Sequence, residues 1–176
     1  MPAYLKLIIG PMFASKTTSL IGSLEKCKYL FKNKEYILFK LNIDNRYSDT
    51  TVKTHSDIER ACKVVSTADD IYKYSKDYDL IGIDEVQFYP GIEDIIIKMM
   101  NEGKSIHVAG LSGDYRQKPF DIISNLIPLA TKIIHKKSIC VDCFKPAYYT
   151  KKKNDNNKLK EIGSYNIYKP VCYKCY

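Results

Sequence analysis

Long hydrophobic runs are missing from this sequence. The most apolar stretch lies near the start, and Lys6, Gly10 and Lys16 interrupt it. A helix that crosses a membrane needs roughly 20 consecutive apolar residues, so we expect neither a membrane span nor a membrane partner. The same interruptions break the apolar block of a secretory signal, which predicts a cytoplasmic protein.

Arginine is also scarce. Only Arg46, Arg60 and Arg116 occur among the 28 basic residues, lysine supplies the rest, and the net charge is +8. Proteins that read base edges or grip phosphates favour the planar guanidinium, whereas scattered lysines act as solvated point charges. The abundance of lysine, isoleucine, asparagine and tyrosine is equally typical of an AT-rich genome. We therefore expect no nucleic-acid partner.

The composition excludes a disordered chain, and the length excludes a large multidomain machine. The 176 residues are 45% hydrophobic and 27% charged, as in ordinary soluble domains. At about 150 residues per domain, the chain is one domain with room for a small appendage. A globule of this length buries roughly 70% of the surface of its unfolded chain, so its folding does not require disulfides.

Short apolar runs alternate with segments of helical spacing. This βαβ alternation predicts the α/β class, with a mostly parallel sheet flanked by helices. Thr67 fits an N-cap, Gly103 fits a helix stop, and the polar residues 42–56 fit a functional loop. The expected strands are residues 4–9, 35–41, 63–66, 79–83, 105–110 and 132–139, and the expected helices are residues 16–31, 68–75 and 92–101.

The segment GPMFASKT at residues 10–17 fits the phosphate-loop pattern GxxxxGK[ST], except that Ser15 stands at the second glycine. It follows an expected strand and opens an expected helix, where backbone N–H groups can face phosphate oxygens. The sequence thus predicts a P-loop NTPase-like fold. Lys16 would contact the β- and γ-phosphates, and Thr17 would support Mg²⁺. The residues expected around ATP are Gly10, Pro11, Met12, Phe13, Ala14, Ser15, Lys16 and Thr17.

A second acidic motif, LIGIDE at residues 80–85, ends an apolar strand with two adjacent carboxylates. Ligands bind at the carboxyl edge of such sheets, so Asp84 suits Mg²⁺ and Glu85 is free to accept a proton from a hydroxyl. The alternative is an acidic helix start with no chemical role. Together with the phosphate loop, the pair favours phosphoryl transfer.

Four of the six cysteines form two CxxC motifs, at Cys140 and Cys143 and at Cys172 and Cys175. Four thiolates can close a tetrahedral structural zinc site with no open position for catalysis. Two disulfides are the alternative, which a cytoplasmic location disfavours. The composition also changes here, so we expect a nucleotide-binding domain over residues 1–139 and a zinc-ribbon-like subdomain over residues 140–176. Cys27 and Cys62 are isolated.

The segment between the two CxxC motifs contains three consecutive lysines and a polar tip. By default a lysine run is a solvated face. The functional alternative is a loop, anchored by zinc at both ends, that closes over a ligand beside the phosphate site.

Taken together, GPMFASKT, DNR at residues 44–46, GIDEVQF at 82–88, LSGDYRQKPF at 111–120 and the paired CxxC motifs make the chain resemble the type II thymidine kinases. NEGK at residues 101–104 and NLIPL at 125–129 resemble the poxvirus branch. The resemblance implies transfer of the γ-phosphate of ATP to the 5′-hydroxyl of thymidine. It also implies Mg²⁺ with ATP, a structural Zn²⁺, a homotetramer and feedback inhibition by dTTP.

The resemblance further implies roles for individual residues. Glu85 matches the catalytic base, Arg46 the arginine directed at the reacting phosphates, and Asp44 the carboxylate that holds the sugar 3′-hydroxyl. Gln87 joins the ATP and Mg²⁺ site. The apolar wall around the base would comprise Met12, Phe88, Leu111, Tyr115 and Phe120. The lasso that reads the thymine edge would comprise Leu159, Lys160, Glu161, Ile162 and Gly163, with Tyr168 packed beside it.

Three residues depart from the family pattern: Ser15 and Ser164 stand at glycine positions, and Tyr115 replaces a phenylalanine. If Ser15 requires a positive φ, it carries backbone strain. Two alternative functions remain. A regulatory GTPase would need an NKxD segment, and the nearest string, NKEY at residues 33–36, lacks the aspartate. A zinc-ribbon nucleic-acid binder would lose affinity steeply with salt.

Overall fold

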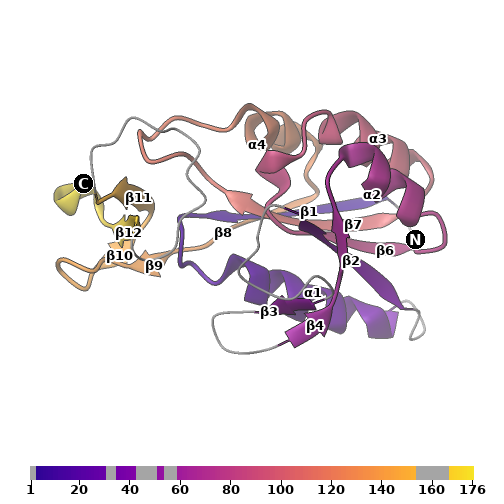
Figure 1. The fold of residues 1–176 in the computed structure, drawn as a ribbon, viewed down its shortest axis with the longest axis horizontal. Helices are drawn as coiled ribbons and strands as arrows, with labels where there is room; N and C mark the ends of the chain where they lie inside the picture. Colours follow the sequence, from indigo (N-terminus) through magenta and orange to yellow (C-terminus); the bar gives the residue numbers. More distant parts are fainter. Residues whose placement is uncertain (1–2, 31–34, 43–50, 54–58, 154–166) are drawn as a thin grey trace.

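Six parallel strands form the central sheet of the computed structural model, which describes residues 3–30, 35–42, 51–53, 59–153 and 167–176 (Figure 1). The order across the sheet is β5-β2-β6-β7-β1-β8, and every neighbouring pair is parallel. The strands are β1 (Tyr4–Gly10), β2 (Tyr36–Leu41), β5 (Lys63–Val65), β6 (Leu80–Ile83), β7 (Ser105–Leu111) and β8 (Lys132–His135). The α/β class expected from the sequence is confirmed.

Helices cover both faces of this sheet (Figure 1). α1 (Lys16–Leu30) lies on one face, and three helices lie on the other. Thr67 caps the first of these three, because its Oγ1 accepts a hydrogen bond of 3.1 Å from the Asp70 N–H. The three helices are α2 (Ala68–Tyr74), α3 (Ile92–Asn101) and α4 (Asp121–Leu126), and the short 3₁₀ turns η1 (Val86–Phe88) and η2 (Ile127–Leu129) accompany them.

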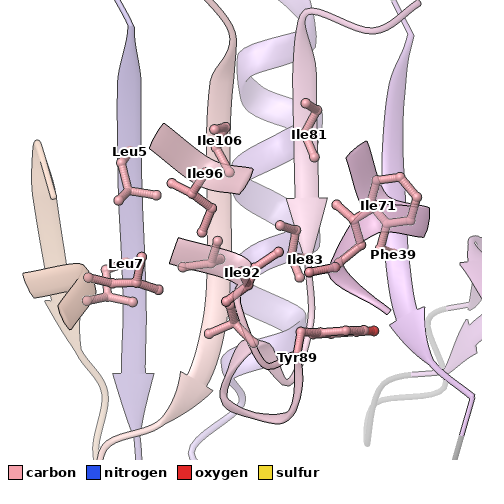
Figure 2. Packing of buried hydrophobic residues seen from close by; sticks show 14 of the residues in the cluster. Leu5, Leu7, Phe39, Ile71, Ile81, Ile83, Tyr89, Ile92, Ile96 and Ile106 are labelled. Atoms are coloured by element: carbon pink, nitrogen blue, oxygen red, sulfur yellow. The ribbon is translucent and has the colours of Figure 1, made fainter. Parts of the chain in front are cut away.

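The core has two layers because successive strand residues point to opposite faces of the sheet. In β1, Leu5 and Leu7 join the core shared with α3, whereas Ile8 joins the core shared with α1. Figure 2 shows the larger layer. Gly82 in β6 faces α1, and a Cβ there would lie 2.5 Å from Leu24 Cδ1. This close packing sets the position of α1 on the sheet. It thereby also positions the loops at the carboxyl edge of the sheet.

Beyond β8 the chain forms short antiparallel strands at one end of the molecule (Figure 1). We call residues 138–153 and 167–176 the C-terminal module. In it, β9 (Ser138–Ile139) pairs with β10 (Pro146–Ala147), β11 (Tyr149–Lys152) pairs with β12 (Tyr168–Val171), and the turn η3 (Tyr173–Cys175) ends the chain.

Two of the expected elements are wrong in detail. Residues 132–139 form two strands, because the Lys136 N–H still donates to Ile9 O of the central sheet at 2.7 Å, whereas Ser138 and Ile139 pair with β10 in a separate sheet. The expected loop over residues 42–56 contains β3 (Thr51–Lys53), which pairs with β4 (Glu59–Ala61). The boundary expected after residue 139 remains a prediction, and β9, just before it, pairs with β10 beyond it.

In the part of the chain that the structure describes, no helix combines the length and the apolar character needed to cross a membrane.

A buried polar network lies between β7 and α1. His107 is fully buried, and its Nδ1 lies 2.9 Å from Ser23 Oγ, which also accepts a hydrogen bond of 2.6 Å from Lys6 Nζ. Because Lys6 donates to Ser23, the Ser23 hydroxyl can donate to Nδ1, which requires a neutral imidazole. Burial lowers the pKa of His107 to about 3, and the nearby Lys6 charge adds to this effect.

We expect His107 to make the fold sensitive to acid. In the unfolded chain it gains a proton near its ordinary pKa of 6.5, whereas the folded chain keeps it neutral down to about pH 3. Stability should therefore decrease as the pH falls through this window, by about 2 kcal/mol between pH 7 and pH 5. Urea unfolding of the wild type and His107→Gln at both pH values checks this. An equal loss of stability in the two proteins would exclude His107 as the source.

Candidate active site

Three loops meet at the carboxyl edge of the parallel sheet. The phosphate loop, residues 10–17, follows β1, the Asp84 and Glu85 pair follows β6, and residues 112–120 follow β7. In open α/β sheets, ligands bind at this edge. The topology therefore brings together segments that are far apart in the sequence.

Lys16 is the first residue of α1 and is nearly buried. Its Nζ donates a hydrogen bond of 2.9 Å to Pro11 O, so the side chain folds back over the phosphate loop. Burial lowers the pKa of the Lys16 ammonium, while the carboxylates of Glu85 and Asp84 act in the opposite direction. The cation is thus held inside the loop, where a phosphate would provide the anionic partner.

The phosphate loop contains two strained residues. Phe13 and Ser15 adopt positive φ angles of 61° and 53°. For a residue other than glycine, this left-handed conformation costs about 1–2 kcal/mol. The strain expected at Ser15 is present, and Phe13 shares it. Contacts around the loop must offset this cost.

Asp84 and Thr17 bring two oxygen ligands together at the start of α1. Thr17 Oγ1 donates a hydrogen bond of 2.8 Å to Asp84 Oδ2. Burial, and after it the neighbouring Glu85 charge, raise the pKa of Asp84 to about 7, although the Thr17 hydrogen bond and Lys16 act in the opposite direction. A carboxylate and a hydroxyl beside a phosphate loop are the ligands typical of Mg²⁺ bound with a nucleotide.

Glu85, the next residue after Asp84, has a left-handed backbone with φ of 52°. Its Oε2 accepts a hydrogen bond of 2.7 Å from Gln87 Nε2. Gln87 Oε1 in turn accepts a hydrogen bond of 3.2 Å from the Leu111 N–H, which links the ends of β6 and β7. Gln87 therefore orients Glu85.

Tyr89, which was not identified from the sequence, directly follows the turn η1, which contains Gln87. It is fully buried, and its ring extends from the end of β6 towards β2 (Figure 2). Burial raises the pKa of its hydroxyl, and the charges of Asp84 and Glu85 raise it further. Among the described residues, the hydroxyl has no hydrogen-bond partner.

Three aromatic residues expected around the base, and Tyr168 expected beside the lasso, form two pairs. Phe88 and Phe120 meet edge to face with 6.2 Å between ring centroids. The ring centroid of Tyr115 lies 6.4 Å from that of Tyr168, which belongs to the C-terminal module. The additional hydroxyl of Tyr115 has a partner, since it accepts a hydrogen bond of 3.0 Å from Arg116 Nε.

Some of the expected site residues lie outside the part of the chain that the structure describes. They are Asp44, Arg46, Leu159, Lys160, Glu161, Ile162 and Gly163.

The four cysteines of the CxxC motifs converge in the C-terminal module. Their sulfur atoms all lie within 4.8 Å of one another, and Cys143 Sγ is 3.5 Å from Cys172 Sγ. Four thiolates that each lie ~2.3 Å from one ion have similar separations. All six cysteines are free, which removes the disulfide alternative. The donor set therefore fits a metal ion such as zinc.

The thiol pKa values in this cluster diverge. Burial raises the pKa of Cys140, but hydrogen bonds with the backbone of Cys172, Asp142 and Cys143 outweigh it and lower the pKa to about 6. Hydrogen bonds with the Cys143 and Cys172 thiols raise the pKa of Cys175 to about 12. Neighbouring thiolates repel one another, and a bound dication would offset this repulsion.

The family model described as thymidine kinase matches residues 3–176. The chain belongs to the thymidine kinase family. Among curated relatives, the thymidine kinase of monkeypox virus is 37% identical over 173 residues, which cover 98% of this chain and 96% of the relative. The thymidine kinases of vaccinia virus (strain Western Reserve) and variola virus are each 36% identical over the same shares. As a thymidine kinase family member, the chain is a nucleotide-binding phosphotransferase.

Two further side chains of this thymidine kinase family member contact the phosphate loop and were not expected. The Met12 N–H donates a hydrogen bond of 3.0 Å to Thr150 Oγ1, and Ser138 Oγ donates one of 3.1 Å to Phe13 O. Thr150 sits beside a lysine run and Ser138 beside a CxxC motif. Neither position carries a sequence signal for such a contact.

Proposed function

We propose that this chain transfers the γ-phosphate of ATP to the 5′-hydroxyl of thymidine and so serves nucleotide salvage, with dTMP and ADP as products. The observation that carries the proposal is the hydrogen bond between Thr17 and Asp84, next to buried Lys16 and to Glu85. Phosphoryl transfer depends mainly on positioning and on neutralising the developing charge. This group of side chains supplies both.

The phosphate loop holds the donor. Backbone N–H groups and the start of α1 face the phosphates, and Lys16 exchanges its hydrogen bond with Pro11 O for one with a β- or γ-phosphate oxygen. Thr17 and Asp84 would hold Mg²⁺, which supplies charge neutralisation on the phosphate oxygens when bound. In this role Asp84 acts as a carboxylate.

Glu85 is the general base of the proposed reaction. Gln87 holds one carboxylate oxygen, Oε2, and leaves Oε1 to accept the proton of the 5′-hydroxyl. In the same proposal, Arg46 approaches the reacting phosphates and Asp44 holds the 3′-hydroxyl, as the family resemblance implies.

The thymine base lies between the phosphate loop and the C-terminal module. Its apolar wall is formed by Met12, Phe88, Leu111, Tyr115 and Phe120, and Tyr168 packs beside the lasso. The ring contacts between Tyr115 and Tyr168 support this location, because they join the loop after β7 to the strand that follows the lasso. Residues 159–163 form that lasso and read the base edge.

Cys140, Cys143, Cys172 and Cys175 would hold a structural Zn²⁺, which would anchor both ends of the lasso segment. We also propose that the active form is a cytoplasmic homotetramer inhibited by dTTP. The family resemblance supports these points.

A nucleoside panel tests the function. Metal-replete protein with Mg·ATP should convert thymidine to its monophosphate. The panel, which includes deoxycytidine, deoxyadenosine and deoxyguanosine, also defines selectivity. Lys16→Met is the inactive control, because it removes the cation from the phosphate loop. Failure to phosphorylate any nucleoside would refute the proposal, and oligonucleotide binding that falls steeply with salt would instead support a nucleic-acid binder.

A further inference from the structure

The phosphate loop is held from outside the parallel sheet by the two hydroxyls of Thr150 and Ser138. Thr150 is buried in β11 and accepts the Met12 N–H at 3.0 Å. Ser138 in β9 donates to Phe13 O at 3.1 Å. The two bonds hold two adjacent residues of the loop, because one engages the N–H of Met12 and the other engages the carbonyl of Phe13.

These contacts fall where the loop is strained. Phe13 and Ser15 both have positive φ angles, so the isolated loop would relax to other conformations. Because the Met12 N–H donates to Thr150, that amide does not point freely into the loop. The C-terminal module thus sets the direction of the Met12 N–H. It also sets the orientation of the peptide groups that follow Met12.

Hydrogen bonds connect the strands that carry the two hydroxyls to their neighbours in the C-terminal module. Thr150 pairs with Pro170 in β12, and the Val141 N–H donates to Pro170 O at 3.2 Å. Ser138 lies two residues before Cys140, the first cysteine of the cluster. Ser138 therefore lies on the strand that leads into Cys140, and Thr150 lies on the strand that pairs with β12, which leads into Cys172.

The segment between β8 and the C-terminal module packs against the start of the phosphate loop. The Lys136 N–H donates to Ile9 O, and a Cβ on Gly10 would lie 2.6 Å from Lys136 O. The chain that leads into β9 thus presses against the first residue of the phosphate loop, where only glycine fits.

From these contacts we propose that Thr150 and Ser138 are positioning residues for ATP, which hold the strained phosphate loop in its nucleotide-binding conformation from the C-terminal module. This inference rests on the proposed function and goes beyond it, because it gives the module a role on the ATP side of the site in addition to the thymidine side. Preorganised loops bind more tightly because less ordering remains to be done on binding.

The test is direct ATP binding to the full chain, measured by equilibrium dialysis with Mg²⁺ and no nucleoside. Thr150→Val keeps the side-chain shape, removes the acceptor, and should raise the Kd for ATP by about tenfold. Ser138→Ala should raise it by about threefold. Thr150→Ser, which retains a hydroxyl, should restore most of the affinity. In steady-state assays, KM for ATP should rise more than KM for thymidine, although Met12 also belongs to the proposed wall around the base.

Thr131→Val is the matched control. Thr131 Oγ1 accepts the Leu5 N–H at 3.2 Å, the same kind of bond at the start of β1 and away from the phosphate loop. Its ATP affinity should equal that of the wild type. If Thr150→Val fails to fold, Ser138→Ala still tests the inference, because this substitution removes only one hydroxyl.

The inference is wrong if folded Thr150→Val and Ser138→Ala bind ATP as tightly as the wild type. It is equally wrong if the control weakens ATP binding as much as they do, or if KM for thymidine rises as much as KM for ATP. Because dialysis needs no acceptor, a chain that binds ATP in this graded way but phosphorylates no nucleoside would refute the proposed function and support the inference.

Discussion

Glu85→Gln should lower kcat for thymidine phosphorylation by about 10²–10⁴-fold while thymidine still binds. Glutamine keeps the size of the side chain and can still accept the hydrogen bond from Gln87 Nε2, so the local geometry is retained. What is lost is the ability to take the proton of the 5′-hydroxyl. The measurement is kcat and KM for thymidine at saturating Mg·ATP.

Glu102→Gln is the matched control for this prediction. Glu102 accepts a hydrogen bond of 2.6 Å from the Tyr72 hydroxyl, on the surface near α2 and away from the phosphate loop. It undergoes the same chemical change and should keep normal turnover. An unchanged kcat in Glu85→Gln would remove Glu85 from the role of general base.

Loss of the metal should unfold the C-terminal module and raise KM for thymidine by more than tenfold. The small core of the module is built largely from the cysteines themselves, with Ala147 and Val171, so little apolar burial remains without a bound ion. Structural zinc in small domains contributes about 10–16 kcal/mol of apparent binding free energy, which is also folding free energy. Chelation and Cys172→Ser should act alike, and residues 140–176 should become sensitive to protease.

Cys27→Ser is the control for the cysteine substitution, because Cys27 lies beside α1 and His107 and outside the cluster. It should bind metal and thymidine normally. A preparation shown by elemental analysis to lack metal, yet with unchanged KM for thymidine, would refute the link between the cluster and the nucleoside site.

The central part of the site could be predicted because local patterns determine it. An apolar strand that ends in Asp84, and a strand followed by the phosphate loop, must deliver their ends to the same edge of a parallel sheet. The hydrogen bond between Thr17 and Asp84 follows from that topology. The cysteine cluster could be predicted for a similar reason, since the CxxC spacing itself determines the geometry of two ligands.

Other features depend on contacts that no local pattern contains. The split of residues 132–139 arises just after Lys136, whose N–H donates to Ile9 O, because Ser138 and Ile139 then pair with β10 instead of the central sheet. α4 is only six residues long, so its sequence is too short to reveal the 3.6-residue spacing of apolar residues that predicts a helix. The hydroxyl of Thr150 reaches Met12 across 138 positions in the sequence, and that contact follows from the packing of the C-terminal module as a whole.

The position of β1 in the sheet has a consequence for how the chain is made. Its neighbours are β7 and β8, whose residues 105–111 and 132–135 are translated about a hundred positions later. The first apolar segment to emerge from the ribosome therefore has no hydrogen-bonding strand until most of the polypeptide is complete. Such long-range pairing folds slowly and leaves nascent chains open to aggregation. We expect ribosome-bound chains that end before residue 105 to require chaperones, and release of the finished chain to coincide with closure of the sheet.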